Sequence, residues 1–168
     1  MTLKLLSFVK EILIIAIIIF ILSNLISYMR QPQMTSQNLP QLNLQTIEGK
    51  NIDFETYKGK PLLVHFWATW CPTCKLETSN IESLSQKYQV ITIAVNSGEI
   101  ATIENFMKQK DAHFDVIDDK DGTLATQFDV EVFPTSFIYN AQGTLLFSEV
   151  GYTSTAGLLA RMAWAKER

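Results

Sequence analysis

Residues 62–74 read Leu62-Leu63-Val64-His65-Phe66-Trp67-Ala68-Thr69-Trp70-Cys71-Pro72-Thr73-Cys74. The first six residues form an almost continuous apolar run, which is typical of a strand buried on both faces of a sheet. The last four are a Cys-x-x-Cys motif, and its Pro72 suits the first position of a helix. This stretch therefore predicts a central strand, a short turn and a helix that begins at the cysteines.

The chain has no cysteine besides Cys71 and Cys74. At the start of a helix, free amides and the positive end of the helix dipole stabilise a thiolate, and a cysteine one turn further lies within disulfide reach. The first thiolate attacks a substrate disulfide, and the second cysteine resolves the mixed disulfide. We therefore predict a redox pair in which Cys71 is the nucleophile and Cys74 is the resolving cysteine.

Other uses of the two cysteines give weaker readings. A structural disulfide would enclose two residues and restrict the unfolded chain little. A closed zinc site needs four ligands, which two cysteines and two distant histidines supply poorly. Cu(I) favours soft sulfur ligands, so copper binding by Cys71 and Cys74 stays open. The sequence predicts no other metal site and no bound cofactor.

The chain after residue 41 alternates between strand and helix patterns. Alternation from Leu42 to Phe54 around Gly49 predicts an N-terminal hairpin. Further strands are predicted at 90–95, 114–117, 135–139 and 144–148, and helices at 72–88, 100–110, 121–128 and 155–166. Strands separated by helices, followed by a hairpin and a helix, indicate an α/β sheet with helices on both faces.

The first thirty residues have the composition of a membrane anchor. Residues 12–29 are almost wholly apolar, and these 18 residues approach the roughly 20 that span a bilayer as a helix. No small-x-small cleavage site follows, which favours an uncleaved anchor over a cleaved signal. Lys4, Lys10 and the terminal amine precede the span and Arg30 follows it, so the positive-inside rule predicts a cytoplasmic N-terminus.

The remainder of the chain is predicted to be an exported, acidic domain on a tether. Residues 31–41 are polar with two prolines and form the predicted linker, and residues 42–168 form the domain. The whole chain has 14 basic and 17 acidic side chains, and residues 31–168 have 11 and 16. This charge argues against nucleic acid as the main partner.

Three stretches resemble the thioredoxin superfamily: Phe66 to Cys74, Phe133-Pro134-Thr135, and Gly151 before the last helix. The resemblance covers residues 39–166. It implies a thioredoxin-like α/β fold, in which a central mixed sheet is flanked by helices, with an N-terminal hairpin and an inserted helix and strand.

Finer features resemble the membrane-tethered TlpA-like branch: Gly59-Lys60-Pro61, Glu77, and the extra helix and strand between 97 and 117. Within that branch, the similarity is greatest to the suppressor-for-copper-sensitivity thioredoxin-like proteins, on residues 106–110, 119–122 and 151–154 with Leu158, Arg161 and Trp164-Ala165. This implies a single-pass protein of the bacterial inner membrane with its catalytic domain in the periplasm. Its partners would be envelope protein thiols and a membrane electron-transfer protein.

The resemblance also implies roles for residues near the cysteines. Pro134 would be a cis proline facing the pair, with an ordinary strand-edge proline as the alternative. Phe133 would contribute to substrate docking or serve as a core aromatic residue. Trp70, Pro72 and Thr73 complete the predicted docking surface.

Two titratable residues are candidates for proton transfer. His65 occupies the strand position where thioredoxins usually have a buried acid, and its imidazole could relay the proton of the resolving cysteine. A hydrogen-bonded core histidine is the alternative. Glu77 lies three residues after Cys74 and shares its helix face, with a surface carboxylate as the alternative. His113 is predicted to be a surface residue.

The sequence thus predicts a membrane-anchored thiol-disulfide oxidoreductase. Reduction of envelope disulfides is preferred, because a tethered domain reaches only nearby partners whereas an oxidant would profit from free diffusion. A disulfide-forming oxidant of the same fold and a Cu(I)-binding copper-tolerance protein that uses the same cysteines are the alternatives.

Overall fold

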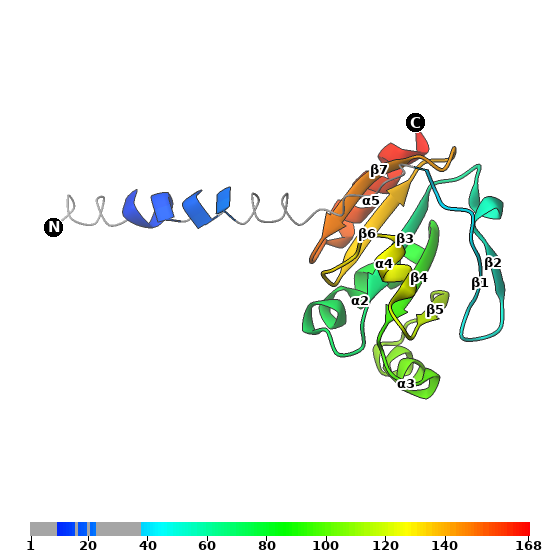
Figure 1. Cartoon of the computed structure of the whole chain (residues 1–168). Helices are drawn as coiled ribbons and strands as arrows, with labels where there is room; N and C mark the ends of the chain where they lie inside the picture. Colours follow the sequence, from blue (N-terminus) through cyan, green and yellow to red (C-terminus); the bar gives the residue numbers. More distant parts are fainter. Residues whose placement is uncertain (1–9, 16, 20, 23–37) are drawn as a thin grey trace. The chain divides into compact units, whose positions relative to one another are not determined.

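The computed structural model describes residues 10–15, 17–19, 21–22 and 38–168 (Figure 1). The chain divides into two units, Met1–Gln31 and Pro32–Arg168. In the first unit, the described residues are helical and exposed. Among all described residues, no helix combines the length and apolar character needed to cross a membrane. Much of the anchor predicted at 1–30 lies outside the described residues.

The second unit is built on a five-stranded mixed sheet in the order β5-β4-β3-β6-β7 (Figure 1). The central strand β3 pairs in parallel with β4 and antiparallel with β6. The bounds are β3 Leu62–Trp67, β4 Gln89–Val95, β5 Val116–Asp119, β6 Thr135–Tyr139 and β7 Leu145–Val150. All six residues of β3 are buried, as the apolar run predicts.

Two hydrophobic cores lie on the two faces of this sheet. Alternate residues of a strand point to opposite faces, so Leu63 and Trp67 join one core while Val64 and Phe66 join the other. The first core is covered by α2 Pro72–Ser85, α3 Ile100–Lys110 and α5 Thr155–Lys166. The second is covered by α4 Thr123–Gln127, the hairpin of β1 Asn43–Gln45 and β2 Asn51–Asp53, and the 3₁₀ helix η1 Phe54–Tyr57. The predicted α/β sheet with both faces covered, the N-terminal hairpin and the inserted helix and strand are confirmed.

Several element boundaries differ from the sequence prediction, and for two of them the structure gives the reason. The helix predicted at 72–88 ends at Ser85, because the N–H groups of Lys87 and Tyr88 both turn back to the Leu84 carbonyl. The strand predicted at 114–117 lies at Val116–Asp119, because Phe114 packs edge-on against the Trp67 ring instead of entering the ladder.

The folded domain begins before the predicted boundary at residue 42. Leu39 is buried in the second core, and its N–H donates to the Gly143 carbonyl at 2.7 Å. Asn38 forms a bridge with Thr144. A single leucine in a polar run is enough to fix this segment, because its side chain fills apolar space under the β6–β7 turn. Residues 31–37 of the predicted linker lie outside the described residues.

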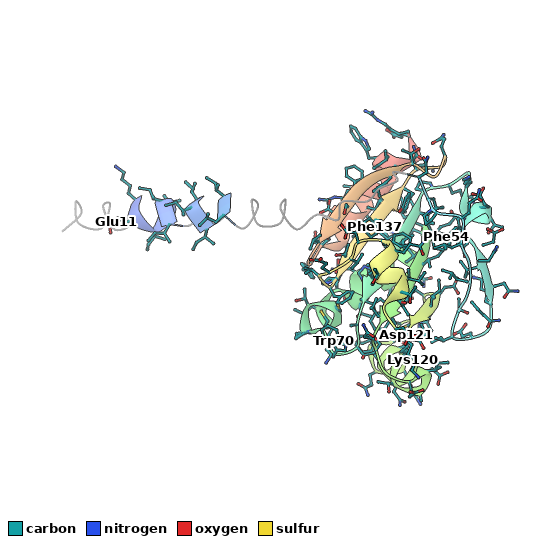
Figure 2. All side chains as sticks on the ribbon, in the orientation of Figure 1. Glu11, Phe54, Trp70, Lys120, Asp121 and Phe137 are labelled. Atoms are coloured by element: carbon teal, nitrogen blue, oxygen red, sulfur yellow. The ribbon has the colours of Figure 1, made fainter. Side chains whose placement is uncertain are left out.

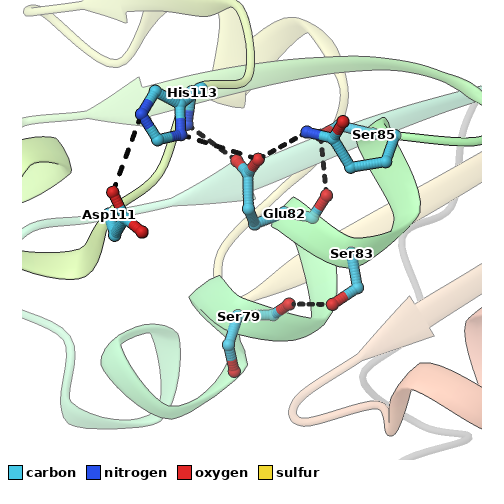
Figure 3. A network of polar contacts seen from close by, with 7 residues as sticks. Ser79, Glu82, Ser83, Ser85, Asp111 and His113 are labelled. Atoms are coloured by element: carbon cyan, nitrogen blue, oxygen red, sulfur yellow. Dashed lines mark hydrogen bonds and ion pairs between the residues drawn. The ribbon is translucent and has the colours of Figure 1, made fainter.

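The inserted segment is fastened to α2 by Glu82 (Figure 3). One carboxylate oxygen accepts the His113 backbone N–H at 2.7 Å. The other carboxylate oxygen accepts a hydrogen bond from the Gln86 side chain at 2.7 Å and lies 3.7 Å from His113 Nδ1. On the other side of the imidazole, an Asp111 carboxylate oxygen lies 3.7 Å from His113 Nε2. The His113 side chain is exposed, as predicted, and the network holds the end of α3 against the helix that carries the cysteines.

The aromatic packing in the second core generates a stability prediction. Phe66 is fully buried, with ring centroids 5.0 Å from Phe128 and 5.9 Å from Phe137. Replacing Phe66 by Ala leaves a cavity that neighbouring rings fill poorly, so Phe66→Ala lowers the free energy of unfolding by about 3–5 kcal/mol. A urea titration of the full chain measures this. The exposed Leu76→Ala is the control, and a loss of similar size there would contradict the packing argument.

Candidate active site

The cysteine pair lies where β3 gives way to α2. Cys71 is the N-cap of α2 in extended conformation, and its Sγ accepts the Cys74 N–H at 3.3 Å. Pro72 occupies the first turn, where its missing N–H costs nothing. Both thiols are free and nearly buried, with 5% and 2% of each residue exposed. The predicted strand, turn and helix are confirmed, and a positive helix end faces the Cys71 sulfur.

A proline loop faces the same sulfur. The Phe133–Pro134 peptide bond is cis, as the resemblance implies. β6 pairs with β3 so that Thr135 lies opposite Phe66, which brings the preceding loop beside the cysteines. The Phe133 carbonyl is 3.6 Å from Cys71 Sγ. Phe133 is half-buried and its side chain packs against both cores. The side chain therefore contributes to the cores, while the backbone carbonyl faces the Cys71 sulfur.

The rim of the site is exposed and partly aromatic. Trp70 is 57% exposed, meets the Phe133 ring edge-on at 5.8 Å, and donates its indole N–H to the Asn96 carbonyl at 3.0 Å. Pro72 is exposed and Thr73 is half-buried. These residues present a surface beside a nearly buried sulfur, an arrangement suited to an extended peptide that carries a cysteine.

Glu77 is fully buried behind the pair, so the surface-carboxylate alternative is wrong. One carboxylate oxygen accepts the Thr153 N–H at 3.0 Å, and the other has no hydrogen-bond partner. Burial raises the pKa of Glu77 to about 7, and the hydrogen bond from Thr153 opposes this only in part. A carboxyl group with this pKa exchanges its proton near neutral pH.

The Cys74 thiol keeps its proton because its surroundings disfavour the thiolate. Burial is the main cause that raises the pKa of the Cys74 thiol, followed by its hydrogen bond with Cys71. A backbone hydrogen bond with Ala68 opposes this rise, and the nearby charges of Cys71 and Glu77 add to it. Any reaction at Cys74 therefore needs a group that takes its proton.

His65 lies on the same face of β3 as Leu63 and Trp67, and 2% of it is exposed. Its Nδ1 is 2.8 Å from the Ser136 Oγ on β6. Burial lowers the pKa of His65 to about 3, so the imidazole is neutral at neutral pH. These observations favour the core-histidine reading, in which the ring links two strands, over proton relay.

Sequence reasoning missed the loop that completes the site from α5. Thr153 supplies the N–H that holds Glu77, and the Asn80 side chain ties the same loop to α2 by bonds to the Thr153 carbonyl at 3.0 Å and the Thr155 hydroxyl at 2.8 Å. The sequence signals for this loop are the Gly151 turn before α5 and the family resemblance of residues 151–154, and neither points to a contact with Glu77. The partners of this loop lie more than seventy residues away in the chain.

The Cu(I) reading stays a prediction. Within residues 38–168 and the described part of the N-terminal unit, no three histidine, cysteine, aspartate or glutamate side chains are grouped as a metal would require.

A Cys-x-x-Cys pair at the head of a helix, facing a cis-proline loop on a mixed sheet, defines a thioredoxin-like protein of thiol-disulfide exchange. Residues 35–148 match the model of the AhpC/TSA family. The chain therefore belongs to the AhpC/TSA family, within the thioredoxin-like superfamily.

Individual relatives agree with this assignment. A thioredoxin-like protein of Haemophilus influenzae is 28% identical over 148 residues, which are 87% of each chain. The thiol-disulfide oxidoreductase ResA of Bacillus cereus is 30% identical over 73% of each chain. The crystal structure of a secreted disulfide oxidoreductase of Mycobacterium tuberculosis superposes with a TM-score of 0.66 at 25% identity, covering 74% of this chain and 96% of that one. The chain is a thiol-disulfide oxidoreductase, and its substrates are protein thiols and disulfides.

The burial of Glu77 predicts an unusual pH dependence of stability. The folded state keeps the Glu77 proton up to pH about 7, whereas the unfolded chain releases it near the ordinary value of 4.5. Because the folded state binds more protons in this window, stability falls as pH rises. Relative to Glu77→Gln, the wild-type free energy of unfolding falls by roughly 3 kcal/mol across the window.

Urea titrations of both chains at several pH values measure this difference. The exposed Glu104→Gln on α3 is the matched control and leaves the pH dependence as in the wild type. A flat difference between wild type and Glu77→Gln would show that the Glu77 carboxyl titrates normally.

Proposed function

We propose that Cys71 and Cys74 form the redox pair of an oxidoreductase that is anchored in the bacterial inner membrane by residues 1–30 and reduces disulfides of periplasmic proteins. The observation that carries the redox assignment is the position of Cys71. Its sulfur sits on the N-terminus of α2, accepts the Cys74 amide and faces the Phe133 carbonyl.

The reaction uses two exchange steps. The Cys71 thiolate attacks one sulfur of a substrate disulfide, and the other substrate sulfur leaves and takes up a proton. Cys74 then attacks the Cys71 sulfur, which releases the second substrate sulfur. Two electrons pass to the substrate, and a Cys71–Cys74 disulfide remains. The Phe133 carbonyl and the rim around Trp70 hold the substrate backbone during the first step.

Glu77 is the proton acceptor for the second step. Cys74 must lose a proton before it attacks, and burial disfavours its thiolate. Glu77 is buried one turn along α2 from Cys74, has one oxygen without a partner, and carries a pKa of about 7. A general base works best when its pKa lies near the working pH, which distinguishes Glu77 from the neutral His65.

The location and the direction of electron flow rest on the N-terminal sequence. The apolar residues 12–29 and the basic residues before them support an anchor with a periplasmic domain. A tethered domain meets partners at the membrane, which supports reduction with electrons drawn from a membrane electron-transfer protein. The resemblances to the TlpA-like branch and to the copper-sensitivity proteins are part of this proposal.

Single cysteine variants test the assigned order of attack. Cys74→Ser should accumulate a mixed disulfide with substrate proteins, because nothing resolves the first intermediate. Cys71→Ser should trap none, because the attacking thiol is lost. Non-reducing gels and mass spectrometry of trapped adducts measure this in cells. Equal trapping by the two variants would contradict the order proposed here.

The redox state of the pair in growing cells tests the direction. Acid quenching followed by alkylation with a mass tag should find Cys71 and Cys74 mostly reduced, because a reductase in an oxidising compartment must be fed electrons. A mostly oxidised pair would point to a disulfide-forming oxidant instead. The same assay on Cys71→Ser calibrates the shift of a single free thiol.

A further inference from the structure

A basic cleft lies at the end of the sheet opposite the cysteines. Its volume is about 550 Å³, and the residues that border it include Pro61 before β3, Tyr88 after α2, and Lys60, Lys87 and Lys166. Because β3 begins beside this cleft and ends beside the redox pair, the two sites are separated by the length of the strand. In Figures 1 and 2 the C-terminus, next to Lys166, marks one end and Trp70 lies toward the other.

The three lysines are concentrated without compensating charge. No aspartate or glutamate borders the cleft, and Glu167 follows Lys166 without lining it. Among the described residues, Lys50, Lys58 and Lys120 each pair with a carboxylate, whereas the three cleft lysines form no ion pair. In a chain with more acidic than basic residues, this grouping leaves a local site for an anion.

The chain enters the domain at this same end. Leu39 bonds to Gly143 in the β6–β7 turn, and the neighbouring Ala141 borders the cleft and accepts the Gly59 N–H at 2.7 Å. Residues 38 and 39, the first described residues of the domain, therefore lie at the end of the domain that carries the lysines.

The last turn of α5 adds an aromatic residue to this end of the domain. Trp164 is 54% exposed, and the Arg168 guanidinium lies 4.9 Å from its ring centroid. Tryptophan with basic neighbours is characteristic of groups that lie at the water–lipid interface. Trp164 and Arg168 do not line the cleft, but they flank its Lys166 in sequence, and an aromatic residue with basic neighbours there favours a lipid headgroup over a free anion as the occupant.

We propose that Lys60, Lys87 and Lys166 bind the phosphate groups of anionic phospholipids, so that the domain rests on the membrane by this end with Cys71 and Cys74 turned away. The orientation rests on the membrane anchor proposed above, because the anchor brings the cleft to the bilayer. Contact between the lysines and the lipid phosphates would hold the domain in one orientation, whereas a domain held by the tether alone would rotate freely.

Lysine acetylation of the full chain in vesicles tests the proposal. The chain is reconstituted in phosphatidylcholine alone, in phosphatidylcholine with about 30% phosphatidylglycerol, and in phosphatidylcholine with soluble glycerol phosphate. Mass spectrometry follows acetylation at each lysine. In the anionic vesicles alone, acetylation of Lys60, Lys87 and Lys166 should slow about fivefold, whereas exposed Lys108 and Lys110 on α3 should not change.

A pair of variants makes the test specific. In the double variant Lys60→Gln/Lys87→Gln, anionic vesicles should no longer slow the acetylation of Lys166. In the control double variant Lys108→Gln/Lys110→Gln, they should slow it as in the wild type. Protection in neutral vesicles, or equal protection at Lys108 and Lys110, would overturn the proposal. Protection by glycerol phosphate in neutral vesicles would assign the cleft to a free phosphate instead.

Flotation separates this proposal from the anchor. If the chain does not float with phosphatidylcholine vesicles, the anchor proposal fails. The cleft proposal then requires flotation with anionic vesicles that is lost in Lys60→Gln/Lys87→Gln and kept in Lys108→Gln/Lys110→Gln. Absence of that difference overturns it.

Discussion

The burial of β3 on both faces and along both edges is the constraint on which the domain depends. Helix layers, hairpin and neighbouring strands cover this one segment, and its last residue fixes where the chain must turn. Since β3 ends in a packed core, the following helix starts at a defined point, and Cys71 becomes its N-cap. The reactive sulfur is thus placed by packing rather than by a flexible loop.

Local signals explain what the sequence predicted correctly. The apolar run of β3, the proline after Cys71 and the hairpin turn at Gly49 act over a few residues, and each specified its element. The burial of Glu77 depends on Thr153, and the position of Leu39 depends on Gly143. Those contacts join distant segments, so neither residue carries a local mark of its environment. Helical spacing placed Glu77 on the correct face without revealing what covers that face.

His65 and Glu77 show how one core treats two ionisable groups differently. Burial favours the neutral form of both, which lowers the pKa of the imidazole and raises the pKa of the carboxyl. The pKa of His65 therefore lies below the physiological pH range, and the neutral imidazole forms a polar contact with Ser136. Burial has the opposite result for Glu77, because it raises the pKa of the carboxyl into the physiological pH range. The desolvation that removes one residue from proton chemistry therefore equips the other for it.

The length of the six-residue strand β3 also sets the distance between the lysine cleft and the cysteines. At about 3.3 Å per residue, the strand spans roughly 20 Å. On a domain that rests on the bilayer by its lysine cleft with β3 upright, the thiols stand about that far above the lipid phosphates. The surface potential of anionic lipids decays over a Debye length of about 8 Å at physiological salt. The Cys71 thiolate would then be insulated from lipid composition, and an electron donor embedded in the membrane would need a loop or domain that rises to meet it.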